Sequence, residues 1–113
     1  MTATFIQDGD AIDYTPSADV AAGAVVVLED LIGVTKRPIP ANTLGALHVA
    51  GVFEFPKDAG SGTEIAFGAT CHWDAGAQVA YASLGGSASD KLLGKAVRAA
   101  SESDETVRVR LTQ

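Results

Sequence analysis

This 113-residue chain has one cysteine and two histidines, and the spacing of its potentially reactive residues suits no catalytic reaction. Cys71, His72 and Asp74 come closest to a reactive cluster. Adjacent residues of a strand point to opposite faces, so Cys71 and His72 are poorly placed to share one metal ion. A zinc site needs at least three well-spaced ligands, and only His48 remains to contribute. We therefore expect Cys71 to be a small buried hydrophobe, and His72 and Trp73 to be packing or interface residues rather than catalysts.

No other motif predicts an active site. Asp8, Asp10 and Asp13 lack the spacing and the distal glutamate of a calcium loop, so we expect only a turn at residues 8–10. The chain has no Gly-x-x-x-x-Gly-Lys-Ser/Thr phosphate loop and no Gly-x-Ser-x-Gly elbow. The sequence thus predicts a protein that is not an enzyme, with no catalytic, cofactor-binding or metal-binding residue.

An internal repeat organises the chain. Residues 19–29 recur 45 positions later as residues 64–74, with the order acid, branched aliphatic, Ala, any residue, Gly, Ala, four-residue strand, acid. A glycine turn that leads into a short strand is an architectural pattern. The length suits one domain, so we expect a single β domain over 1–113, with an N-terminal arm at 1–7 and half-repeats at about 19–56 and 64–111.

Short apolar or alternating runs separated by turn residues predict an all-β fold, either a small β-barrel or a β-sandwich. We expect strands at 2–7, 11–14, 25–28, 31–35, 44–49, 52–55, 70–74, 78–82 and 106–111. Residues 89–100 are ambiguous: a strand is favoured, but their apolar spacing also fits one short helix, which Gly94 would weaken.

Composition limits the classes of partner that the protein is expected to bind. Fourteen acidic against eight basic residues give a net charge of −6, which argues against binding to a nucleic-acid backbone. No apolar run approaches the roughly 18 residues of a membrane helix, so we expect no membrane partner. The single cysteine excludes an internal disulfide. The first residues lack the features of a signal peptide, so we expect synthesis in a cytoplasm.

Two features suit a binding surface. The 2–7 segment could add to another chain's sheet by β-augmentation, or it could be an ordinary edge strand of its own sheet. The aromatic residues of the middle of the chain form either the core or an oligomer interface; they are Phe53, Phe55, Phe67, Trp73 and Tyr81.

An ordered set of segments resembles a family of small phage and prophage proteins regarded as capsid decoration or cement proteins. These segments are residues 4–16, residues 19–23, Leu31-Ile32-Gly33-Val34, Gly51-Val52-Phe53-Glu54-Phe55-Pro56-Lys57, Trp73-Asp74 and Thr106-Val107-Arg108-Val109-Arg110-Leu111. Members are often labelled RecA/RadA-type recombinases. Such an enzyme needs a phosphate loop and a far longer chain, so we reject that label.

The resemblance implies a virion protein on the capsid surface that bridges major capsid subunits as a homodimer or homotrimer. It offers no catalytic residue. Our candidate capsid contacts are the arm residues Thr2, Ala3, Thr4, Phe5, Ile6 and Gln7, and Arg37, Pro38 and Asn42 of the 37–42 loop. The alternative is a non-catalytic binding module, for carbohydrate or as a tail or adaptor component of the virion.

Overall fold

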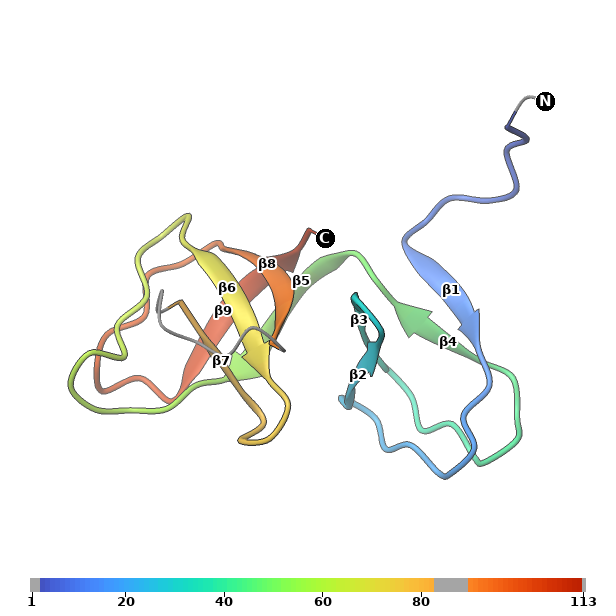
Figure 1. The fold of residues 1–113 in the computed structure, drawn as a ribbon, viewed down its shortest axis with the longest axis horizontal. Helices are drawn as coiled ribbons and strands as arrows, with labels where there is room; N and C mark the ends of the chain where they lie inside the picture. Colours follow the sequence, from blue (N-terminus) through green and yellow to red (C-terminus); the bar gives the residue numbers. More distant parts are fainter. Residues whose placement is uncertain (1–2, 83–89, 113) are drawn as a thin grey trace.

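The computed structural model of this protein describes residues 3–82 and 90–112, in which all regular secondary structure is β (Figure 1). The strands form two sheets whose neighbours all pair antiparallel. In spatial order, the first sheet contains β1 (Ala11–Tyr14), β4 (Gly45–His48), β3 (Leu31–Val34) and β2 (Val25–Leu28). The second contains β5 (Gly51–Pro56), β9 (Thr106–Leu111), β8 (Lys91–Ala96), β6 (Thr70–Asp74) and β7 (Val79–Tyr81). The all-β prediction is confirmed, and two separate sheets are consistent with its β-sandwich alternative.

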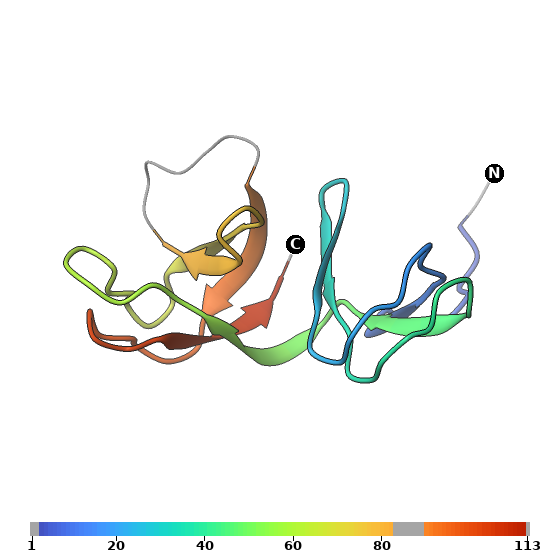
Figure 2. The same cartoon turned by 90° about the horizontal axis from the view of Figure 1, so that it is seen from below.

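The two sheets meet through the β2–β3 hairpin. The chain passes from the first sheet to the second between β4 and β5, through Val49 and Ala50. The hairpin then packs against the second sheet, because Ile32 and Val34 belong to the same buried cluster as Phe55. Figure 2 shows the hairpin standing between the five-stranded sheet and the β1–β4 pair. One buried cluster therefore contains residues of both sheets.

The two repeated segments make the same backbone contacts. Val20 pairs with Ile39 as an isolated antiparallel bridge, with N–O distances of 2.9 and 2.8 Å. At the corresponding place in the second segment, Ile65 pairs with Ala100 in the same way, again at 2.9 and 2.8 Å. The two bridges therefore occupy matching places, the first shortly before β2 and the second shortly before β6.

The glycine turns of the two segments also match. Gly23 and Gly68 have positive φ angles of 77° and 86°, which glycine adopts without steric cost. Their N–H groups donate to the carbonyls of Thr35 and Ala96, both at 2.7 Å. The strand order β1-β4-β3-β2 likewise corresponds to β5-β9-β8-β6. The second sheet thus repeats the plan of the first and adds β7.

One expected strand is absent. Residues 3–8 have no strand pairing, and Thr2 lies outside the described residues, so the predicted strand at 2–7 is wrong for the part that is described. The turn at Gly9–Asp10 is present, but no strand precedes it. A strand needs a neighbouring strand to pair with its N–H and C=O groups, and the arm lies outside the sheet, which begins at β1.

Residues 91–96 resolve the ambiguity between strand and helix. They form β8 between β6 and β9, so the short-helix alternative is wrong. Gly94 has a φ of 154°, and a Cβ placed there would collide with the carbonyl of Arg110 on β9. The glycine that weakens a helix therefore permits close approach of two strands.

The aromatic residues divide between core and surface. Phe55 and Trp73 are each only 2% exposed, and their ring centroids lie 5.9 Å apart. Phe53 and Tyr81 are half-buried, and Phe67 is 73% exposed. The core interpretation is thus confirmed for Phe55 and Trp73, whereas Phe67 lies on the surface.

Candidate functional site

The side chains that could take part in chemistry are used in packing and hydrogen bonding within the fold. Cys71 is fully buried, as predicted, and burial raises the pKa of its thiol. His72 stacks on Tyr81, with ring centroids 5.7 Å apart. The Tyr81 hydroxyl donates to Asp90 Oδ2 at 2.6 Å; partial burial and this hydrogen bond raise the pKa of Tyr81 to about 12. Across the part of the chain that the structure describes, no three His, Cys, Asp or Glu side chains group as a metal site.

The same described residues include no helix that is long and apolar enough to cross a membrane. The features that remain to be explained are on the surface of the molecule.

The N-terminal arm exposes two large apolar side chains. Phe5 is 79% exposed and Ile6 is 81% exposed. The arm runs away from β1 at one end of the molecule (Figure 1), and Gln7 Nε2 donates to the Ala11 carbonyl at 3.2 Å near its base. Ala3 and Thr4 are exposed as well. Adjacent apolar side chains held in water are typical of a binding segment, and the arm has no strand partner in its own sheet.

The 37–42 loop is fixed to the body while its outer residues stay exposed. Ile39 is buried and pairs with Val20, and the Asn42 N–H donates to the Pro16 carbonyl at 2.8 Å. Arg37, Pro38 and Asn42 are all exposed. Asn42 has a φ of 60°, in the left-handed region that asparagine tolerates. The structure therefore presents the three predicted loop residues on a well-anchored turn.

A mostly apolar groove of about 630 Å³ runs beside this loop. Arg37 and Pro38 line it, together with Lys36 and the side chain of Leu44, which is 65% exposed. Leu44 was expected to begin the strand at 44–49 and was not predicted as a surface residue, because a short strand pattern does not decide which way its first side chain faces.

Phe67, one of the aromatic residues expected to form either the core or an oligomer interface, is a second residue with an exposed apolar side chain. It lies in the turn before β6 and occupies the repeat position that Ala22 has in the first segment. A large aromatic residue directly before a turn glycine is the signal that could have indicated its exposure.

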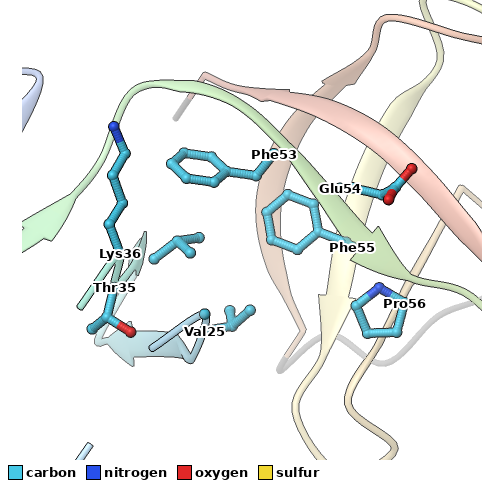
Figure 3. A pocket seen from close by; sticks show the side chains of 9 residues that line it. Val25, Thr35, Lys36, Phe53, Glu54, Phe55 and Pro56 are labelled. Atoms are coloured by element: carbon cyan, nitrogen blue, oxygen red, sulfur yellow. The ribbon is translucent and has the colours of Figure 1, made fainter. Parts of the chain in front are cut away.

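A smaller cleft of about 280 Å³ separates the β2–β3 hairpin from β5. Figure 3 shows Val25, Thr35 and Lys36 on one side of this cleft and Phe53 and Phe55 on the other. The Lys36 Nζ lies 6.0 Å from the centroid of the Phe53 ring. Apolar or basic surface therefore occurs at the arm, the groove, the cleft and the β6 turn, on a body 46 Å long.

Comparison with known proteins assigns the family. Searches of curated proteins and of solved structures find no match to this chain. A family model described as phage cement protein matches residues 6–111, which span both sheets and every described strand. This match shows that the chain belongs to the phage cement protein family, and so has a structural role in the virion, at the capsid.

Proposed function

We propose that this protein binds the outside of the capsid shell and stabilises it by bridging major capsid subunits. Family membership supplies the capsid as partner. The observation that supports bridging is the spread of exposed apolar residues over both sheets: Phe5 and Ile6 precede β1, Leu44 precedes β4, and Phe67 precedes β6. Exposed apolar surface on both sheets gives the protein separate places at which to contact neighbouring capsid subunits.

Bridging explains stabilisation through multivalency. Once one contact forms, the next one forms within the same complex, so modest individual affinities combine into tight binding. Internal pressure must then break several contacts at once to separate two capsid subunits. A homodimer or homotrimer of this chain, which the proposal includes, multiplies the contacts further.

The proposed capsid contacts are the arm, residues 2–7, and the loop residues Arg37, Pro38 and Asn42. The arm is suited to β-augmentation because residues 3–8 pair with no strand of their own sheet. The loop is suited to rigid docking because backbone hydrogen bonds to Pro16 and Val20 hold it in place. One contact is thus adaptable and the other is preformed.

The test is a pair of capsid reconstructions, with and without the protein, combined with a denaturing gel of purified virions. Bridging predicts density that touches at least two major capsid subunits, and a copy number comparable to that of the major capsid protein. Density on a single subunit would refute bridging. Only a few copies per virion would instead indicate a minor tail or adaptor component.

A further inference from the structure

The four edge strands of the two sheets differ in how they are protected. β1 carries Asp13 and β5 carries Glu54 and Pro56, which are residues that discourage pairing with another strand. β7 is bridged on its outer side, where Ala80 pairs with Lys57. β2 contains only Val25-Val26-Val27-Leu28, with no charge and no proline. Among the edge strands that the structure describes, β2 alone lacks such protection.

The pairing of β2 with β3 shows which backbone groups are open. Val26 lies opposite Gly33, and the Thr35 N–H donates to the Ala24 carbonyl at 3.0 Å. Since hydrogen-bonded and non-hydrogen-bonded positions alternate along an antiparallel pair, the N–H and C=O groups of Val25 and Val27 point away from β3. No hydrogen bond from another residue in 3–82 or 90–112 reaches these groups.

The second half of the molecule shows what covers the corresponding edge. β6 is the counterpart of β2, and β7 pairs antiparallel with it. His72, which pairs with Tyr81 of β7, is the counterpart of Val27. In the first half, the chain turns directly from β2 into β3 through Glu29 and Asp30, and no strand within residues 3–82 or 90–112 pairs with the outer side of β2. The first sheet is therefore one strand short of the second.

We propose that the open edge of β2 accepts an extended segment of the major capsid protein, which adds to the first sheet as a fifth, antiparallel strand. This inference rests on the proposed function, which makes the capsid the partner. The arm of the same chain is excluded because it precedes β1, at the opposite edge of the sheet. The arm of a second copy is already assigned to the capsid by that function.

The cleft beside β2 indicates the chemistry of this segment. Side chains on one face of the added strand would enter the cleft next to Val25 and Phe53 (Figure 3), so apolar residues are expected at alternate positions. Lys36 lies at the cleft, and neither ion pair found among the described residues involves it. An acidic residue at the end of the segment near Lys36 would supply complementary charge. The arm and β2 then engage capsid segments at opposite edges of one sheet, which is a geometry for bridging.

The test compares two substitutions at one position, Val27→Pro and Val27→Thr. Proline removes the outward N–H, which an edge strand tolerates, and Pro56 of β5 is a native example of a proline on an edge strand. Threonine keeps both the N–H and the branched shape. Binding to capsids that lack the protein is titrated for each variant, and thermal unfolding checks the fold. Loss of one buried hydrogen bond and of close docking should weaken binding about ten- to hundredfold for Val27→Pro only.

Hydrogen exchange on the unmodified protein provides a second measurement that does not depend on the variant folding. The peptide containing β2 should exchange quickly when free and become protected on the capsid. Unchanged exchange there, or full binding by Val27→Pro, would overturn the proposal. If instead the unmodified protein sediments as an oligomer without capsids and Val27→Pro as a monomer, the edge joins copies of this chain and the capsid segment is the wrong occupant. Failure of the unmodified protein to bind capsids at all would refute the proposed function, and the capsid segment with it.

Discussion

Replacing both apolar residues of the arm, Phe5→Ser with Ile6→Ser, should weaken capsid binding severely without changing the stability of the free protein. The two side chains are 79% and 81% exposed, so a capsid site can still bury about four-fifths of each. Full burial of such a side chain is worth roughly 1.5–3 kcal/mol, so the pair contributes about 2–5 kcal/mol. That corresponds to a dissociation constant roughly 30-fold to several thousandfold higher.

The assay is a titration of labelled protein against purified capsids that lack it, read as occupied sites per capsid. The matched control is Ala3→Ser with Thr4→Ser, which changes the same arm without removing a large apolar side chain. Urea unfolding of both variants should match that of the unmodified protein. An unchanged dissociation constant for the Phe5/Ile6 variant would show that the arm's apolar residues do not bind the capsid. A loss of stability would show instead that they pack on their own body.

Three further predictions concern the body of the protein. Lys57 is buried, and its Nζ donates to two backbone carbonyls and one hydroxyl at 2.8–3.2 Å, so Lys57→Met should leave these acceptors unpaired and cost about 1–3 kcal/mol in urea unfolding. An equally stable variant would show that these hydrogen bonds of Lys57 do not contribute to stability. Gly94→Ala should destabilise the protein by more than about 2 kcal/mol, because the added Cβ would meet the Arg110 carbonyl. Gly9→Ala places its Cβ in open space, so it should leave stability unchanged. Equal effects of the two substitutions would refute the close approach of β8 and β9 at Gly94. Tyr81 has a pKa raised from 10.0 to about 12, so its contribution to stability is complete below pH 10 and is lost as the pH rises to 12. Chemical unfolding across this pH range should show that loss in the unmodified protein and not in Tyr81→Phe, and identical pH profiles would contradict it.

Much of the strand content follows from local pattern. The alternation of Val107, Val109 and Leu111 predicts β9, and these three side chains are indeed buried. The apolar run at 25–28 and the acidic turn after it predict the β2–β3 hairpin, which is present with the expected bounds to within one residue. Such segments are predictable because side-chain periodicity and turn preference depend on residues close in sequence.

The candidate site was predictable only in part. The exposed arm and the exposed residues of the 37–42 loop are where the sequence places them, but the arm is not the expected strand. The exposure of Leu44 and the groove beside it were not predicted, and the sequence left Phe67 open between the core and an oligomer interface. Exposure depends on which distant segments cover a residue, and a single sequence carries little information about that. The assignment of the arm and loop to the capsid remains a prediction.

The sequence by itself showed the internal repeat, and it determined the short strands and the glycine turns because these depend on the conformational preferences of neighbouring residues. Tertiary structure alone decided which strands are edges: β6 is covered by β7, whereas no strand among the described residues covers the outer side of its counterpart β2. The physical reason is that strand pairing joins residues far apart in the chain. The repeat predicts two similar strands, but only their neighbours in space decide which one is left able to bind.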